Sequence, residues 1–255
     1  EVDAAERWCR VEPGIVLDEL NAALKEHGLR FAPDVSTASR ATIGGMMANN
    51  SSGARSVYYG KTIDHVLEQT VLFADGSIAE LRPMAGAELE AACEGDTIPA
   101  RGYRLMRRLG VELAGEVEAR FPKVLRRVMG YNLDEFGDAG RCDLTKLMVG
   151  SEGTLGVVLE AKLKLVPLPK AKAVVVIQFG DVLDALGATP AILQHGPSAV
   201  EVMDSFILDH TKLNAALHRQ RESFIKGEPG AILCVEFYGD TAAVLAPRME
   251  ELERD

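Results

Sequence analysis

The sequence lacks the spacings and runs that identify several protein classes. Four cysteines lie far apart with no CxxC pair, which excludes a zinc ribbon or an iron–sulfur cluster within these residues and gives no sign of a disulfide framework. No apolar run approaches the roughly 20 residues that a membrane span needs, and the acidic N-terminus is not a signal peptide. The expected compartment is the cytoplasm, with a peripheral place at the inner face of the membrane as an alternative.

Positive charge is also scarce. The chain carries 28 Lys and Arg against 38 Asp and Glu, a net charge of −10. This balance argues against a nucleic-acid partner, because a phosphate backbone must be met by clustered Lys and Arg. One basic run, Lys123 to Arg127, is typical of a solvated face and less often of a site for an anionic ligand.

The length and the two ends suggest a piece of a larger protein. With 255 residues, of which 47% are hydrophobic, the chain suffices for one large domain or two modest ones. It opens on Glu1 without Met, and Glu250 to Asp255 lie in a helical pattern with no Gly or Pro stop. We therefore expect truncation at both ends.

Hydrophobic periodicity predicts strands and helices along the whole chain. Leu17, Leu20 and Leu24 share one face of a short helix that Gly28 ends. The expected strands are Trp8 to Val11, Leu29 to Ala32, Val66 to Phe73, Ile78 to Leu81, Lys146 to Val149, Val157 to Val166, Val174 to Phe179, Ala199 to Met203 and Ala231 to Phe237. The other expected helices are residues 86–121, Val182 to Gln194 interrupted by Pro190, Ser205 to Gln220, and Thr241 onward with a kink or a late start at Pro247.

Two glycine-rich passages interrupt this regular pattern. The first includes residues 43–53, IGGMMANNSSG, where the paired glycines could begin a helix whose free N–H groups face an anion, with Thr42 as its N-cap. The second, GSEGTLG at 150–156, matches neither the dinucleotide fingerprint nor the Walker loop. Alone, the first passage is typical of a tight helix–strand packing joint followed by a polar loop, and the second of a β-turn with a bulge. The pair at this separation is more specific.

Together the passages resemble the flavin-binding domain of the vanillyl-alcohol oxidase and para-cresol methylhydroxylase (PCMH) family. Within that family, the chain resembles the branch that includes the glycolate oxidase flavin subunit and the D-lactate and D-2-hydroxyglutarate dehydrogenases. The matching stretches are VEPGIVLDELNAAL (11–24), FAPDVSTASRATIGGMMANNSSG (31–53), YGKTIDHV (59–66), GYNL (130–133), KLMVGSEGTLGVVLEAKLKLVPLP (146–169) and SAVEVMD (198–204).

The resemblance implies an α+β fold and a division into two domains. Residues 1–169 would be the second part of a PCMH-type FAD-binding domain, without its N-terminal pyrophosphate loop. Residues 170–255 would be an incomplete substrate domain, an α+β cap whose antiparallel sheet has helices on one face. The boundary falls at Pro167-Leu168-Pro169, since two prolines end the strand and stiffen the joint.

The resemblance also implies a cofactor, a reaction and a set of contact residues. The cofactor is FAD, and the reaction is oxidation of a D-2-hydroxy acid of the lactate, glycolate or 2-hydroxyglutarate class by hydride transfer to the flavin. An electron acceptor or a fused iron–sulfur portion would complete the intact protein. The implied FAD contacts are Pro33, Thr42, Gly44, Gly45, Ala48, Asn49, Ser51, Ser52, Gly53, Gly60, Gly153, Gly156, Val157 and Val158.

Departures from the family pattern limit what this chain does alone. Arg126 and Arg127 are the candidate clamp for a substrate carboxylate. Asn132 stands where relatives often carry Asp, so the resemblance assigns no role to that position. The family's metal-binding stretch is absent, no metal site is expected among the five histidines, and Glu152 would cap a turn. We expect weak or no FAD binding and no turnover from this chain alone. The alternatives are a non-catalytic FAD-binding partner subunit and a pure interaction module.

Overall fold

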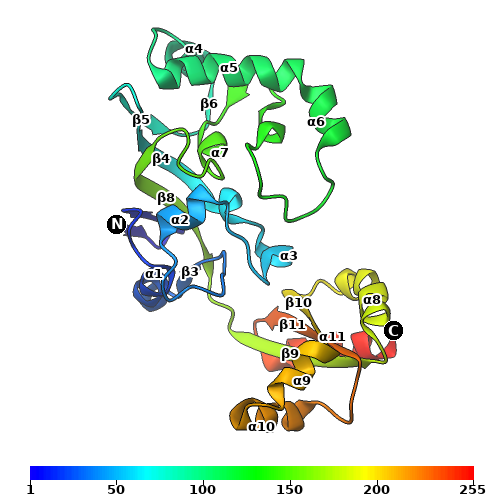
Figure 1. Cartoon of the computed structure of the whole chain (residues 1–255). Helices are drawn as coiled ribbons and strands as arrows, with labels where there is room; N and C mark the ends of the chain where they lie inside the picture. Colours follow the sequence, from blue (N-terminus) through cyan, green and yellow to red (C-terminus); the bar gives the residue numbers. More distant parts are fainter. The chain divides into compact units, whose positions relative to one another are not determined.

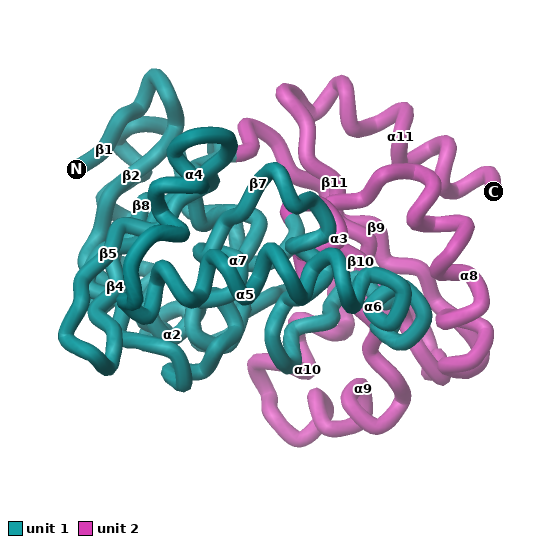
Figure 2. The backbone as a smooth tube through the Cα atoms, turned by 90° about the horizontal axis from the view of Figure 1, so that it is seen from above, with its two compact units in different colours: residues 1–53, 60–168 teal, residues 54–59, 169–255 magenta.

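The structure is a computed structural model that describes residues 1–255, and these residues form two compact units. Unit 1 comprises residues 1–53 and 60–168, and unit 2 comprises residues 54–59 and 169–255 (Figure 2). The chain therefore leaves unit 1 after Gly53, spends six residues in unit 2, and returns at Gly60 before it leaves again after Leu168. None of the helices has both the length and the apolar surface to cross a membrane.

Unit 1 is built around the long strand β8 (Val157–Pro167) (Figure 1). Its sheet has the order β1-β2-β8-β4-β5, with antiparallel neighbours, and β3 pairs with the later part of β8. A separate ribbon joins β6 to β7. The strand bounds are β1 Val2–Asp3, β2 Trp8–Val11, β3 Leu29–Phe31, β4 Val66–Leu72, β5 Ile78–Leu81, β6 Met84–Ala85 and β7 Arg141–Cys142.

Helices cover this sheet and fill two apolar clusters. Leu17, Leu20 and Leu24 of α1 are buried in the first cluster, as their spacing predicts, and Gly28 ends the element in the left-handed conformation. Helix α5 buries Tyr103 in the second cluster. The helical bounds of unit 1 are α1 Leu17–Leu24, η1 Lys25–His27, α2 Ile43–Ala48, η2 Thr62–His65, α4 Gly86–Ala92, α5 Ile98–Glu112, α6 Ala114–Arg120, η3 Leu133–Phe136 and α7 Thr145–Met148.

One strand prediction in unit 1 is wrong. The run from Lys146 to Val149 lies mostly in helix α7, not in a strand. The N–H of Thr145 donates to the Asp143 carboxylate at 3.0 Å, and the N–H of Val149 donates to the Thr145 carbonyl at 3.0 Å. A run of four residues is too short for periodicity to separate the two structures, and the local acceptor on Asp143 favours a helical turn.

Unit 2 is a three-stranded antiparallel sheet with helices. Its order is β10-β11-β9, so β11 is the central strand. Leu233, Val235 and Phe237 of β11 face helices α8 and α11, while Ile232 faces α9 and α10 on the other side. The bounds are α3 Ser56–Tyr59, β9 Ala171–Phe179, α8 Val182–Gln194, β10 Ala199–Asp204, α9 Ser205–Thr211, α10 Ala215–Phe224, β11 Ala231–Gly239 and α11 Ala242–Arg254. The predicted α+β class, with antiparallel sheets and helices, is confirmed. The expectation that helices cover one face of this sheet is wrong, because α9 and α10 pack on its second face.

Three helix predictions in unit 2 need correction. Helix α8 continues through Pro190, and α11 begins at Ala242, five residues before Pro247. The helix expected at 205–220 is two helices, because Asn214 caps α10 by accepting hydrogen bonds from the N–H groups of Ala216 and Leu217. Pro190 and Pro247 both lie beyond the first turn of their helices, where a proline removes an intrahelical hydrogen bond, and no local contact explains why either helix continues through its proline.

Candidate functional site

The start of α2 has no free N–H groups, contrary to the prediction. The Thr42 hydroxyl caps the helix by accepting from the Gly45 N–H at 3.2 Å, as expected. However, the Ile43 N–H donates to Ile15 O at 2.9 Å and the Gly44 N–H to Pro13 O at 2.8 Å. The expectation that these groups face an anion is therefore wrong, because the chain itself satisfies them.

The other end of α2 brings the two glycine-rich passages together. The Met47 and Ala48 carbonyls accept hydrogen bonds from the N–H groups of Gly150 and Glu152, each at 2.9 Å. Gly150 has φ +85° and Glu152 has φ +52°, so both residues adopt the left-handed conformation, which is costly for a non-glycine residue. Glu152 thus contributes through its backbone; no hydrogen bond from its side chain supports the predicted role as a turn cap.

A cavity of about 270 Å³ lies where these passages meet. Six of the residues predicted to contact FAD line it, namely Gly44, Ala48, Gly153, Gly156, Val157 and Val158. Four other lining residues were not predicted from the sequence, namely Pro13, Met47, Met148 and Ser151. Their only signal was proximity to the glycines, since apolar side chains at such positions are ordinarily core residues.

The composition of this lining limits its chemistry. No lining side chain is ionisable, so the cavity cannot supply a general acid or base. The N–H group of the lining residue Gly153 donates no hydrogen bond within the chain, so it is available to a ligand. Apolar walls with a free backbone donor suit part of a large planar cofactor, while a volume below about 300 Å³ is too small for a whole one.

The remaining predicted contacts lie outside this cavity lining. Pro33 is buried, Gly45 is exposed, and the Ser51 hydroxyl donates to the Asn49 side-chain oxygen at 2.6 Å. Gly53 passes so close to the Asp34 carbonyl that an added Cβ would lie 1.7 Å from its oxygen. Ser52 is partly buried, and Gly60 has φ +81°. Their roles as FAD contacts stay predictions.

Asn50 shapes the turn between α2 and these polar residues. It has φ +50°, is fully buried, and its Oδ1 accepts from the Ile63 N–H at 3.0 Å. Its Nδ2 has no hydrogen-bond partner within the chain. Such a group costs free energy unless a water or ligand satisfies it, so the polar turn has a donor left over beside the predicted flavin loop.

Asn132 holds the backbone of one cavity wall in place, a role that was not predicted from the sequence. It is 1% exposed, and its Nδ2 donates to the carbonyl oxygens of Lys146 at 3.1 Å and Val149 at 2.8 Å. These bonds hold the segment that leads from α7 to Gly150. Asn132 therefore positions the wall that carries Met148 and Ser151, and its amide donor is the property that matters.

The two arginines of the predicted carboxylate clamp differ in availability. Arg127 is only 12% exposed and already pairs with Asp134, with its guanidinium 4.7 Å from the Phe121 ring centroid. Arg126 is exposed and forms no ion pair with another residue of the chain. Of the two, Arg126 has the more accessible charge, so the clamp stays a prediction that rests mainly on it.

The histidines lie in separate environments. His65 is buried and packs edge-to-face against Phe31, with ring centroids 6.0 Å apart. His195 Nε2 lies 3.0 Å from the Asp255 carboxylate, and His210 Nδ1 lies 2.8 Å from the Phe206 carbonyl. The side chains thus make local structural contacts, and the structure contains no group of three or more metal-ligating residues.

Comparisons with known proteins match both ends of the chain to families of FAD-linked proteins. A model described as "FAD binding domain" matches residues 1–82, and one described as "FAD linked oxidases, C-terminal domain" matches residues 168–255. A D-2-hydroxyglutarate dehydrogenase of Pseudomonas putida is 39% identical over 98% of this chain and 25% of its own length. A D-lactate dehydrogenase of Anaerostipes hadrus is 26% identical over 95% of this chain and 41% of its own length.

A solved structure has the same fold. An alkyldihydroxyacetonephosphate synthase superposes with a TM-score of 0.63 at 20% identity, covering 100% of this chain and 39% of that chain. The chain spans a quarter of the length of the D-2-hydroxyglutarate dehydrogenases that it matches.

Proposed function

The chain belongs to the FAD-linked oxidase family, and on that premise we propose that it is part of a flavoenzyme that oxidises a D-2-hydroxy acid. Residues 1–169 take the FAD-binding role and residues 170–255 the substrate-domain role. The observation that carries the proposal is the cavity into which both glycine-rich passages converge. The proposed activity is that of the full-length protein, because this chain corresponds to a quarter of its relatives' length.

Among hydroxy acids, D-2-hydroxyglutarate is the substrate that we favour. Four D-2-hydroxyglutarate dehydrogenases are 32–39% identical to this chain over at least 94% of it. The D-lactate dehydrogenase of Anaerostipes hadrus is 26% identical over a comparable share. A substrate with two carboxylates also gives the exposed Arg126 a second group to bind besides the carboxylate at the reacting carbon.

The chain's own residues would bind and orient the cofactor. When bound, FAD supplies an acceptor for the hydride of the substrate α-carbon. The free N–H group of Gly153 would donate to it, and the side chains of Met47, Met148 and Val157 would exclude water from one part of it. The lining of this cavity holds no group that could accept the hydroxyl proton, so that step belongs to residues elsewhere in the full-length protein.

FAD titration tests the cofactor assignment. The full-length protein is stripped of flavin and titrated with FAD, following flavin fluorescence, in wild-type form and as Ala48→Leu. The larger side chain fills the cavity, and we expect the Kd to rise by about tenfold or more, consistent with an overpacking cost of about 1–3 kcal/mol. Ala87→Leu, on the exposed face of α4, is the matched control. Equal Kd values for all three proteins would refute the assignment of the cavity.

Flavin bleaching tests the reaction. Under anaerobic conditions we expect D-2-hydroxyglutarate to bleach the flavin band near 450 nm, and D-lactate and glycolate to do so more slowly. Bleaching by D-lactate alone would reassign the substrate. The isolated chain is expected to retain little FAD and to show no turnover.

A second function is favoured by the absence of ionisable residues in the cavity lining. In this alternative the chain belongs to a non-catalytic FAD-binding subunit whose partner carries the catalytic groups. It predicts stoichiometric FAD without bleaching by any hydroxy acid until a second polypeptide is added. An electron acceptor or iron–sulfur portion, and a cytoplasmic place that could extend to the inner membrane face, complete the proposal for the full-length protein.

A further inference from the structure

The segment of residues 54–59 belongs to unit 2, although the residues on both sides of it in the sequence belong to unit 1. It follows Gly53 directly and precedes Gly60, two of the predicted FAD contacts. The position of this segment therefore affects Gly53, at the end of the loop of residues 49–53, and Gly60, because both are covalently joined to it.

An ion pair holds the segment on the unit 2 sheet. Arg55 donates from Nε to Glu236 Oε1 at 2.8 Å and from Nη2 to Glu236 Oε2 at 2.9 Å. The side chains are 26% and 14% exposed. A two-pronged contact of this kind fixes orientation as well as distance, which a lysine could not do.

The sheet gives Glu236 little freedom to find another position. Glu236 lies on the central strand β11, paired with Ala199 on one side and Val174 on the other. Its Oε1 also accepts from the Ser198 hydroxyl at 3.0 Å. Burial would raise the pKa of the Glu236 carboxyl, but the bonds from Arg55 and Ser198 hold that pKa below its usual value.

Aromatic rings pack around the same pair. Tyr238 follows two residues later on the same face of β11, and the rings of Tyr58 and Tyr59 lie 5.9 and 6.2 Å from its centroid. The Arg55 guanidinium lies 5.9 Å and the Lys172 ammonium 5.4 Å from that ring. The segment thus covers the part of this sheet face next to Glu236.

We infer that the Arg55–Glu236 ion pair is a positioning device that holds the loop of residues 49–53 in the conformation that receives the flavin. This inference rests on the proposed function, because it takes that loop as a flavin contact. Arg55 and Glu236 need not touch the cofactor. They act through the backbone that joins them to Gly53 and Gly60.

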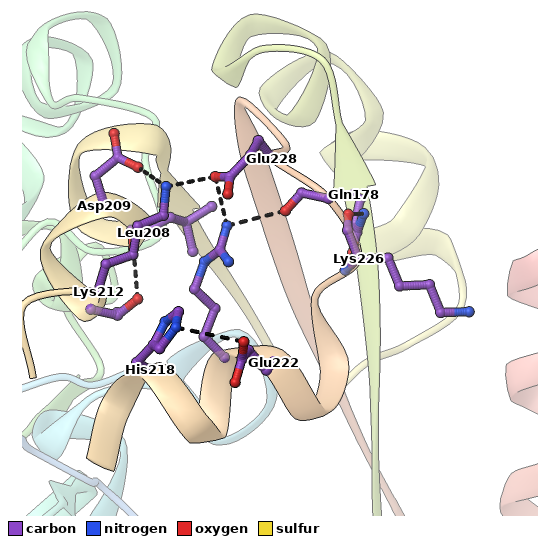
Figure 3. A network of polar contacts seen from close by, with 11 residues as sticks. Gln178, Leu208, Asp209, Lys212, His218, Glu222, Lys226 and Glu228 are labelled. Atoms are coloured by element: carbon purple, nitrogen blue, oxygen red, sulfur yellow. Dashed lines mark hydrogen bonds and ion pairs between the residues drawn. The ribbon is translucent and has the colours of Figure 1, made fainter. Parts of the chain in front are cut away.

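Hydrogen exchange and FAD affinity, measured on the full-length protein, test the inference together. Arg55→Met removes the charge and both hydrogen bonds to Glu236. Arg55→Lys keeps the charge but cannot make the two-pronged contact, and Glu236→Gln keeps the shape of the side chain but removes its charge. The matched control is Glu228→Gln, which breaks a different ion pair of unit 2, that of Glu228 with Arg221 and Lys212 (2.8 and 2.7 Å; Figure 3 shows Lys212 and Glu228).

Two backbone bonds of unit 1 report on the loop. The Ser51 N–H donates to Met46 O at 2.9 Å, and the Thr62 N–H donates to Ser51 O at 3.0 Å. In the apo-protein we expect Arg55→Met and Glu236→Gln to speed exchange of these two amides by about tenfold and to raise the FAD Kd by about tenfold, on the order of 1.4 kcal/mol. Arg55→Lys should give a smaller change in both, and Glu228→Gln no change in either.

The outcomes separate this inference from the proposed function. Faster exchange confined to residues 54–59, with an unchanged FAD Kd, overturns the inference and leaves the proposed function standing. Equal effects from Glu228→Gln also overturn it, since general loss of stability would then be the cause. A wild-type protein that binds no FAD overturns both. If Arg55→Met does not fold, Arg55→Lys and Glu236→Gln decide the matter.

Discussion

Replacement of Asn132 by Asp is expected to destabilise unit 1 strongly although the two side chains have the same shape. The Asn132 amide donates to the carbonyl oxygens of Lys146 and Val149, at 3.1 and 2.8 Å. An ionised carboxylate has no hydrogen to donate, and it would face two carbonyl oxygens in a site that is 1% exposed. Leaving each of these carbonyl oxygens without its hydrogen bond costs about 1–3 kcal/mol. We therefore expect the free energy of unfolding to fall by about 3–5 kcal/mol at pH 7 for Asn132→Asp.

The pH dependence of this loss has a definite sign. Burial beside two carbonyl oxygens favours the protonated form of the new carboxyl, so its pKa is higher in the folded than in the unfolded protein. Between these two pKa values the folded state binds more protons, and stability falls as the pH rises. The difference from wild type should therefore be smaller at pH 4.5 than at pH 7.

Urea unfolding followed by tryptophan fluorescence measures the effect in the correct unit. The chain has 1 tryptophan, Trp8, and it lies in β2 of unit 1. The matched control is Asn21→Asp, because the Asn21 Oδ1 only accepts, from the Phe31 N–H at 2.8 Å, and a carboxylate can do the same. If Asn132→Asp costs no more than Asn21→Asp, the donor role assigned to Asn132 is wrong.

Two further predictions concern a close backbone approach and an acid-sensitive ion pair. Gly110→Ala should destabilise unit 1 by about 1–3 kcal/mol, because a Cβ there would lie 1.7 Å from the Phe136 carbonyl oxygen. At Gly115 an added Cβ would have no neighbouring atom within 4 Å, so Gly115→Ala should stabilise unit 1 by about 0.5–1 kcal/mol in the same urea assay. The pKa of Glu236 is lowered in the folded protein. The stabilising effect of its ionised carboxylate is therefore complete above the unfolded-state pKa of about 4.3 and is lost as the pH falls through the folded-state pKa. Thermal unfolding between pH 6 and pH 3 should show a steeper loss of stability for wild type than for Glu236→Gln, and parallel curves would contradict this.

Local pattern was sufficient for most strands and for the first helix. Leu17, Leu20 and Leu24 are buried as their spacing predicts, and Gly28 ends the element. Strand β8 was expected at Val157 to Val166 and runs Val157–Pro167. These elements follow from side-chain period and from the conformational freedom of glycine, both of which are local properties.

The cavity required information that local pattern does not contain. Gly44 and Gly153 line the same cavity although more than a hundred positions separate them along the sequence. What joins their passages is a pair of bonds from the N–H groups of Gly150 and Glu152 to the last carbonyls of α2. Backbone donors carry no residue-specific signal, so only the resemblance to a known family brought the two passages together in advance.

Glu236 is the opposite case, a residue whose sequence context did contain an unused signal. It is the charged residue within the otherwise apolar strand Ala231–Gly239, and a carboxylate on such a strand needs a partner, because buried charges are paired. The sequence offers 28 Lys and Arg as partners, and the one that binds lies 181 positions away. The need for a cation could thus be predicted, but its identity could not. The structure identifies Arg55 as the partner. It also shows that residues 54–59 belong to unit 2, which the single predicted domain boundary at residues 167–169 could not indicate.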